Sequence, residues 1–354
     1  MKKRPSELTM PDSIGRALIR VTGHVASAGL AGRRLAILLY HRVLPRPDPM
    51  YPGEPDAGVF GRYMTALRDS FNVVGLAEGV AMLAEGRLPP RAVAITFDDG
   101  FADTYHVALP VLRSLRLDAT VFVATDFLDG GCMFNDAVIE ACRHAPLARW
   151  RTGIDEIGDV EIGSEQRRAA VAAGLVKQLR YLDPQLRSDY ATQLMRSCGT
   201  QPPCNLMMTR DEVIALSTAG IEIGAHTASH PILARLSAAE AECEIMSGRA
   251  SLSQLTGGQI RLFAFPNGKP GIDFTARDVD TVSRLGFQGA VTTAWGCADR
   301  SVDRFELPRI GCWGETPMRF SIRLLWYFAR GMSRAGAIRP ACADDRQDGS
   351  TAKP

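Results

Sequence analysis

Two adjacent carboxylates, Asp98 and Asp99, follow the apolar run of residues 92–95. Such a run predicts a buried strand, and carboxylates at its end are costly to bury unless a metal, a cation or protons compensate their charge. Both side chains can reach one cleft at a strand end, and Gly100 allows a sharp turn after them. Taken alone, the Asp-Asp-Gly sequence would favour a surface turn.

Two histidines, His226 and His230, follow a second strand-like run at residues 221–225. Pro231 disfavours helical backbone at the preceding residue, so we place the pair in a turn between a strand and a loop. A single histidine would more often be structural. Two imidazoles at ligand spacing, together with a carboxylate pair at another strand end, predict a metal site.

The elements that must position these residues alternate between strands and helices, which predicts an α/β fold with parallel pairing in a barrel or a doubly wound sheet. Barrels of this class place their active sites just past the carboxyl ends of the strands, where both motifs lie. Residues 136–200 interrupt the alternation and predict a helical insertion. Strands are expected at residues 35–40, 71–74, 92–98, 119–124, 221–225, 262–265 and 287–293.

Helix signals lie between these runs. Asp56 is expected to cap one helix, and a capping box begins at Ser237 before a stop at Gly257. Further helices are expected at residues 76–85 and 108–115.

Composition narrows the class of protein. The formal net charge of +2 on 354 residues argues against a dedicated nucleic-acid-binding protein. Eight scattered cysteines include no Cys-x-x-Cys pair, which argues against a cysteine zinc site or a disulfide scaffold and favours free thiols.

The ends of the chain predict no membrane span. Lys2-Lys3-Arg4 precedes no unbroken apolar run, so we expect no signal peptide and a cytoplasmic protein. Residues 319–330 mix basic and aromatic side chains, which predicts a helix packed on the domain, with peripheral contact at the inner membrane face as the alternative. The expected divisions are a helical extension at 1–34 (helix within 13–30), a main domain at 35–315, a helix at 316–337 and a disordered tail at 338–354.

Three motifs in order resemble those of the polysaccharide deacetylases, the NodB-homology proteins of carbohydrate esterase family four. They are Thr96-Phe97-Asp98-Asp99-Gly100, His226-Thr227-Ala228-Ser229-His230 and Phe265-Pro266-Asn267-Gly268. The resemblance covers residues 35–315. It implies a distorted (β/α)7 barrel, here with the helical insertion, and removal of acetyl groups from N- or O-acetylated sugars with one divalent metal.

Matched motif by motif, the family's metal ligands fall on Asp99, His226 and His230, and its general base falls on Asp98. One carboxylate and two imidazoles leave coordination positions open for water and a substrate carbonyl. A bound metal would lower the pKa of that water and polarise the carbonyl. Zinc is the expected metal, although cobalt, nickel, manganese and iron also suit these ligands.

The general acid departs from the usual family pattern, because no histidine follows His230. A Tyr-His pair near the start also occurs in a family branch with permuted motif order that includes the biofilm poly-N-acetylglucosamine deacetylases. The resemblance to that branch assigns the acid to His41, which follows Tyr40 at the end of the first strand. A structural histidine is the alternative.

Four residues are expected to bind substrate or support the site. The resemblance assigns the backbone N–H of Asn267, after Pro266, to the oxyanion, although a simple turn also fits this sequence. Ala264 stands where many members carry an arginine, and Arg309, in the last strand, is the candidate to supply that charge, although its residue type favours a surface position. Asn135 is expected to line the sugar cleft or to cap the insertion helix.

These residues predict a metal-dependent enzyme that deacetylates an N-acetylated sugar of a polysaccharide or lipid-linked glycan, in exopolysaccharide or cell-envelope metabolism. Two alternatives stay open. One is a non-catalytic glycan-binding protein that retains the fold. The other is a different mononuclear metalloenzyme, since two histidines and one carboxylate also describe non-haem iron oxygenases.

Overall fold

The computed structural model describes residues 33–311 and 316–330. The predicted helix within 13–30 and the predicted tail at 338–354 lie outside these residues. Six of the eight cysteines fall within the described residues, and all six are free thiols, as the sequence predicted.

The predicted seven-stranded barrel is confirmed. Seven parallel strands pair in a closed ring, and a short strand, β2 (Asn72–Val73), pairs with β3 outside it. In ring order the seven are β1 (Leu35–Tyr40), β10 (Leu307–Gly311), β9 (Gly289–Trp295), β8 (Leu262–Ala264), β7 (Glu222–Ala225), β4 (Thr120–Val123) and β3 (Ala92–Phe97).

The ring is distorted where it closes. One edge of β3 pairs with β1 from Leu35↔Ala92 to Tyr40↔Phe97. The other edge is shared, because β2 pairs with the start of β3 and β4 pairs only with its end. This arrangement leaves the carboxyl end of β3 between β1 and β4, at the mouth of the barrel.

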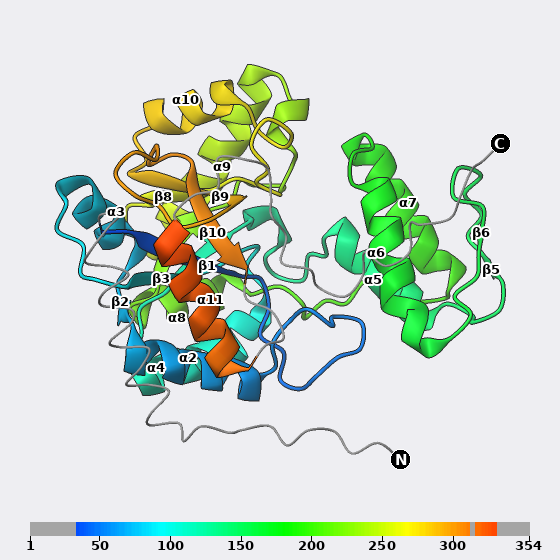
Figure 1. Cartoon of the computed structure of the whole chain (residues 1–354). Coiled ribbons are helices and arrows are strands. Elements are labelled where there is room, and N and C mark those ends of the chain that lie inside the picture. Colours follow the sequence, from blue (N-terminus) through cyan, green and yellow to red (C-terminus); the bar gives the residue numbers. More distant parts are fainter. Residues whose placement is uncertain (1–32, 312–315, 331–354) are drawn as a thin grey trace, which may run out of the picture.

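In the described part of the chain, seven helices surround the ring (Figure 1). They are α2 (Ala57–Ser70), α3 (Leu76–Glu85), α4 (Leu109–Leu115), α8 (Arg210–Thr218), α9 (Ala238–Thr256), α10 (Ala276–Arg284) and α11 (Pro317–Arg330). The predicted helix signals are confirmed: Asp56 accepts a hydrogen bond from the N–H of Val59, Ser237 begins a capping box, and Gly257 ends α9 in left-handed backbone. These caps satisfy backbone groups that would otherwise lack partners at the helix ends.

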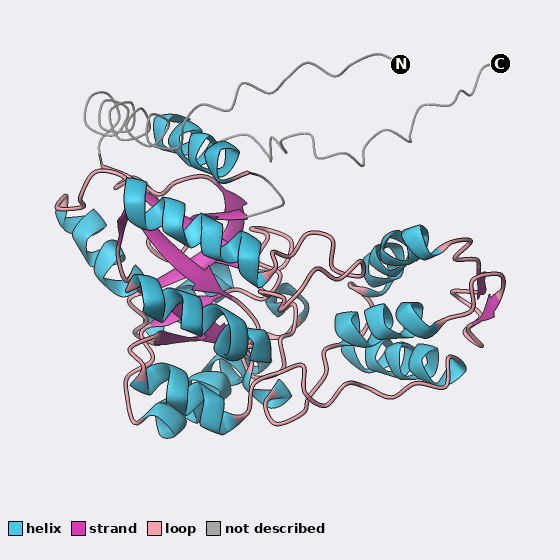
Figure 2. Cartoon of the chain, turned by 90° about the horizontal axis from the view of Figure 1, so that it is seen from below, coloured by secondary structure: helices cyan, strands magenta, loops and turns pink. Residues whose placement is uncertain are grey.

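The insertion forms a separate group of helices beside the barrel, visible in both views (Figures 1 and 2). It contains α5 (Phe134–His144), α6 (Arg168–Leu179), α7 (Pro184–Ser197) and a short hairpin of β5 (Trp150–Arg151) and β6 (Asp159–Val160), which the sequence did not predict. Val138, Trp150 and Leu194 belong to its own apolar core. The chain enters it after β4 and returns to β7, and these two strands pair with each other in the ring.

Helix α11 packs on the barrel, as favoured from the sequence. Phe320 and Leu324 are fully buried, and α11 lies against α2 and β1. Ile322 and Trp326 face outward, 54% and 40% exposed. Peripheral membrane contact through this helix stays a prediction. No helix in the described part of the chain is long and apolar enough to span a membrane.

Candidate metal centre and active site

The predicted site residues meet at one end of the barrel. His41 follows β1, Asp98 and Asp99 follow β3, and His226 follows β7. Because parallel strands end on the same rim, residues far apart in sequence become neighbours there. The N–H of Asp98 donates to the carbonyl of Tyr40 at 2.9 Å, so the Tyr40-His41 pair and the Asp motif are joined directly through the backbone.

Three of these side chains form a candidate metal centre. Nε2 of His226 lies 3.3 Å and Nε2 of His230 lies 3.4 Å from the same oxygen, Oδ1 of Asp99. One possible ligand atom from each residue lies within 4.8 Å of the others. One carboxylate oxygen and two imidazole nitrogens converging on one point are the donor set of a divalent transition metal with open positions.

The protonation of the histidines suits metal binding. Nδ1 of His226 lies 2.7 Å from the carbonyl of Ala264, a contact that assigns the proton to Nδ1 and leaves Nε2 free for the metal. Burial lowers the pKa of His230 to about 4, despite the attraction of Asp99, so its imidazole is neutral at neutral pH. Burial opposes ionisation of Asp99, but its interactions with the neighbouring imidazoles of His226 and His230 hold its pKa below the usual value.

Unusual backbone conformations gather at this site. Asp99, Thr227, His230 and Asn267 have φ between 56° and 73°, in the left-handed region that favours glycine. Residues held in such conformations persist only where the surrounding structure fixes them, and they are common at functional sites. The strained positions therefore lie in the three motifs that the sequence identified as candidate site residues.

Helix α9 fixes the histidine loop. Oε2 of Glu244 accepts hydrogen bonds from the N–H groups of Ala228 and Ser229 at 3.1 and 2.9 Å, and Oε1 accepts from the Ser229 hydroxyl at 2.7 Å. At Gly248 a Cβ would lie 2.4 Å from the carbonyl oxygen of Thr227, so the helix approaches the loop too closely for any side chain there. The sequence analysis missed Glu244, since no local motif links it to a loop 15 residues earlier.

Asp98 forms a buried ion pair with Arg309 from β10. The two Nη atoms donate to the two carboxylate oxygens at 2.7 and 2.6 Å, and Nε donates to the carbonyl of Thr292 at 2.9 Å. Arg309 is 1% exposed, so the surface alternative is wrong. Burial opposes the charge of Asp98, but the Arg309 guanidinium outweighs it and holds the pKa of Asp98 below its usual value.

His41 lies beside this pair in a cavity of about 110 Å³. Arg309, Glu54 and Trp295 also line this cavity. Burial raises the pKa of Glu54, and the electrostatic attraction of His41 opposes this shift. A half-buried imidazole next to Asp98 is placed where a general acid is needed. The sequence did not single out Glu54 or Trp295, because neither belongs to a motif.

The third motif forms a turn beside β8. Gly268 donates its N–H to the carbonyl of Pro266, and Asn267 between them adopts the left-handed conformation. Among the described residues, none accepts a hydrogen bond from the Asn267 N–H. A backbone donor without a protein acceptor is what an oxyanion hole requires.

Asn135 lies in the first turn of α5 and lines a cavity that also contains His230. The helix is capped by Met133 with no side-chain hydrogen bond, so the capping alternative for Asn135 is wrong. The neighbouring Asp136 is 1% exposed, and its Oδ2 has no hydrogen-bond partner among the described residues. Burial raises the pKa of Asp136 to about 7, and repulsion from Asp99 adds to the effect against the attraction of Arg42.

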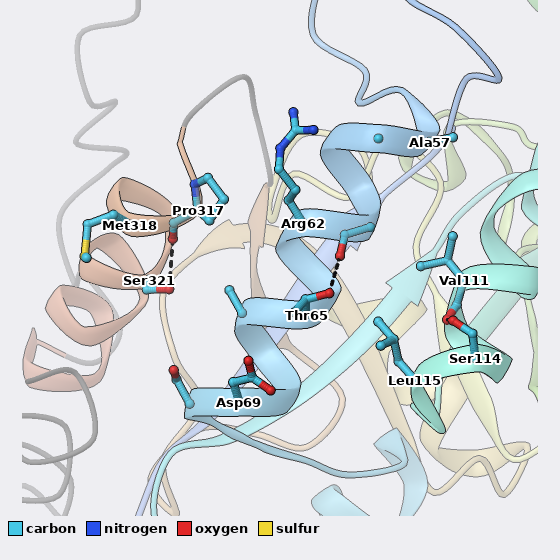
Figure 3. Close-up of a pocket in the computed structure, with 14 residues that line it drawn as sticks. Ala57, Arg62, Thr65, Asp69, Val111, Ser114, Leu115, Pro317, Met318 and Ser321 are labelled. Atoms are coloured by element: carbon cyan, nitrogen blue, oxygen red, sulfur yellow. Dashed lines mark hydrogen bonds between the residues drawn. The ribbon is translucent and has the colours of Figure 1, made fainter. Parts of the chain in front are cut away.

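A larger cavity, about 590 Å³, lies away from these residues, between α2, α4 and α11 (Figure 3). Arg62, Asp69 and Ser321 are among its polar residues, and it contains no histidine. The hydroxyls of Thr65 and Ser321 already donate to backbone carbonyls of their own helices. None of the candidate site residues at the barrel mouth lines this larger cavity.

Comparison with known proteins agrees with this geometry. The family model described as polysaccharide deacetylase matches residues 85–163 and 186–290, which together make up more than half of the chain. The chain belongs to the polysaccharide deacetylase family. The YxkH protein of Bacillus subtilis (strain 168), which carries the name of a polysaccharide deacetylase, is 33% identical over 92 residues, 25% of this chain and 32% of that protein. The match thus spans about a third of this curated relative.

Solved structures share the fold of this polysaccharide deacetylase family member. The deacetylase PplD of Streptococcus pyogenes, solved with acetate, has a TM-score of 0.57 and 18% identity, covering 84% of this chain and 99% of its own. IcaB of Ammonifex degensii has a TM-score of 0.53 and 18% identity, with 84% and 98% coverage. A de-N-acetylase of Aggregatibacter actinomycetemcomitans has a TM-score of 0.51 and 18% identity, covering 78% and 94%.

Proposed function

We propose that the protein is a metal-dependent hydrolase that removes the acetyl group from an N-acetylated sugar of a polysaccharide or lipid-linked glycan. One observation carries the proposal: the Asp99, His226 and His230 ligand set lies directly beside the carboxylate of Asp98, which Arg309 holds ionised. The names of YxkH, PplD and the de-N-acetylase support the same reaction class. A non-haem oxygenase would have no use for the second carboxylate and its arginine.

Three groups of the protein have separate roles in the proposed reaction. Asp98 accepts a proton from the attacking water, and its two bonds to Arg309 fix the direction in which it does so. His41 donates a proton to the nitrogen of the departing amine. The N–H of Asn267 stabilises the negative charge that develops on the acetyl oxygen. The products are acetate and a free amino sugar.

The metal ligands are Asp99, His226 and His230 in this proposal. A bound divalent ion, for which we propose zinc, would polarise the acetyl carbonyl and lower the pKa of the attacking water. The chain's own contribution is to keep His230 neutral by burial and to direct Nε2 of His226 inward through its bond to Ala264.

Acetate release from N-acetylated chito-oligosaccharides tests the proposal. The metal-loaded protein should release acetate, and a chelator should abolish release until metal is returned. Asp98→Asn should lower kcat/KM by about 10²- to 10⁴-fold and retain the metal, because the base is lost and the ligands are not. Asp99→Asn should lose the metal, measured by elemental analysis.

Asp118→Asn is the matched control, since Asp118 is exposed at the opposite end of β4. It should behave as the parent protein in both measurements. Acetate release that survives both chelation and Asp98→Asn would contradict the proposal.

A further inference from the structure

A cavity of about 300 Å³ separates the barrel mouth from the insertion. His230 and Ser229 line it from the barrel, and Asn135, Phe134 and Arg187 line it from α5 and α7. It therefore begins at a metal ligand and extends along the insertion. A sugar linked to the one being deacetylated would occupy such a space.

Arg187 is the unusual residue in this cavity. Its guanidinium lies over the ring of Phe134, with Cζ 4.3 Å from the ring centroid, and Nη1 donates to the carbonyl of Arg180 at 3.1 Å. The side chain is half-buried, and no carboxylate forms an ion pair with it within the described residues. Its remaining N–H groups donate to no acceptor among the described residues, so the guanidinium is held in place but its charge is not neutralised by a carboxylate.

No acidic side chain pairs directly with Arg187 within the described residues. No aspartate or glutamate lines the cavity. Asp183, the acidic group that acts on Arg187 electrostatically, accepts hydrogen bonds from the N–H groups of Gln185 and Leu186 at the start of α7. Glu244, behind Ser229, is bonded to the histidine loop. A cation removed from water without a partner is unfavourable, and an anionic ligand would relieve that cost.

We propose that this cavity binds an anionic group of the substrate, a carboxylate or a phosphate, through Arg187. The inference rests on the proposed function and narrows its substrate: the acetylated sugar is attached to an acidic unit, either a uronate in the glycan or a phosphate at its end. The planar guanidinium fork suits both groups because each presents two oxygens to it.

The first experiment compares kcat/KM for acetate release from three probes. They are neutral tri-N-acetylchitotriose, a tetrasaccharide of alternating glucuronate and N-acetylglucosamine, and UDP-N-acetylglucosamine. At least one anionic probe should have a higher kcat/KM than the neutral probe. The identity of that probe shows whether the charge comes from a uronate or from a phosphate. Arg187→Ala should lower kcat/KM for that probe by about tenfold or more while leaving the neutral probe within about twofold. Arg187→Lys should retain part of the preference.

Arg196→Ala is the matched control, because Arg196 is exposed on the same helix and does not line the cavity. It should leave all three probes unchanged. Equal losses for neutral and anionic probes in Arg187→Ala, or no loss for either anionic probe, would overturn the inference.

A binding experiment distinguishes failure of this inference from failure of the proposed function. Calorimetry on metal-loaded Asp98→Asn should show that adding Arg187→Ala weakens binding of the preferred anionic probe by about tenfold. Arg187-dependent binding with no acetate release from any probe by the parent protein would support the cavity and contradict the deacetylase. Acetate release with binding that is independent of Arg187 would contradict the cavity alone.

Discussion

The two walls of the active-site cleft are built differently. On the barrel wall each charged group has a partner: Asp98 is bonded to Arg309, and Asp99 to the two histidines. On the insertion wall Arg187 forms no ion pair with any described carboxylate. Asp136 is buried in the same insertion without lining the cavity, and its Oδ2 has no donor among the described residues. The barrel wall is prepared for chemistry before substrate arrives, whereas the insertion wall leaves polar groups for the substrate to satisfy.

The largest expected effect comes from removing Arg309. Arg309→Met should destabilise the protein by about 3–5 kcal/mol, because Asp98 would become an uncompensated buried charge. It should also lower kcat/KM by about 100-fold or more, since the base loses its orientation. Denaturant unfolding and acetate release measure the two effects.

A second substitution sharpens that test. The double variant Arg309→Met with Asp98→Asn should regain most of the stability but none of the activity. Arg284→Met, which removes an exposed ion pair with Glu242, should destabilise the protein far less than Arg309→Met, because water screens the exposed charges. Equal costs for the two arginines would show that the barrel wall has no special electrostatic role.

The next effect concerns His41. His41→Asn should lower kcat by about 10²-fold or more while metal content stays intact, because a proton donor is lost and no ligand is. Elemental analysis measures the metal content, and single-turnover acetate release measures the loss of activity. Near-normal turnover would leave His41 with a structural role only.

A smaller effect is expected from the anchor of the histidine loop. Glu244→Ala should weaken metal affinity by about 10- to 100-fold, because three hydrogen bonds that hold the loop are lost. Glu242→Ala, two residues earlier on α9, removes only a surface ion pair and should leave affinity unchanged. A competition titration with a chromophoric chelator measures both, and equal affinities would contradict the anchoring role.

The last test concerns the pH dependence of stability and the buried Asp136 of the insertion. Because burial raises the pKa of Asp136 to about 7, the folded protein retains a proton there that the unfolded chain loses near pH 4. Stability of the metal-free protein should therefore fall as pH rises from about 4 to 7, by up to about 4 kcal/mol from this group. Asp136→Asn should remove that dependence, measured as unfolding free energy at several pH values.

Exposed Asp155, also in the insertion, provides the control. Asp155→Asn should leave the pH dependence of stability as it is in the parent protein. The contrary result is a stability that rises over this pH range by the same amount in the parent protein and in Asp136→Asn. It would show that the buried acid of the insertion is as well compensated as the charges of the barrel wall.

Sequence alone could predict most of the barrel wall, but only Asn135 of the insertion wall. The strands, the Asp and His motifs and the caps of α2 and α9 are local patterns, and parallel strands bring their ends together. The sequence offers Arg309 as a source of charge for the site, but its pairing with Asp98 depends on closure of the ring. Arg187, Glu54 and Glu244 act through contacts between distant segments, so no spacing in the sequence marks them. The β5–β6 hairpin was missed because its strands have two residues each.

The position of the insertion has a consequence for how this protein can diversify. It leaves and re-enters the ring between β4 and β7, which are already paired, and it is packed around an apolar core of its own. Its helices can therefore be exchanged or remodelled without changing the order of the strands that hold the catalytic groups. Selectivity for a new glycan can evolve there as a replaceable module, while the hydrolytic machinery is inherited unchanged.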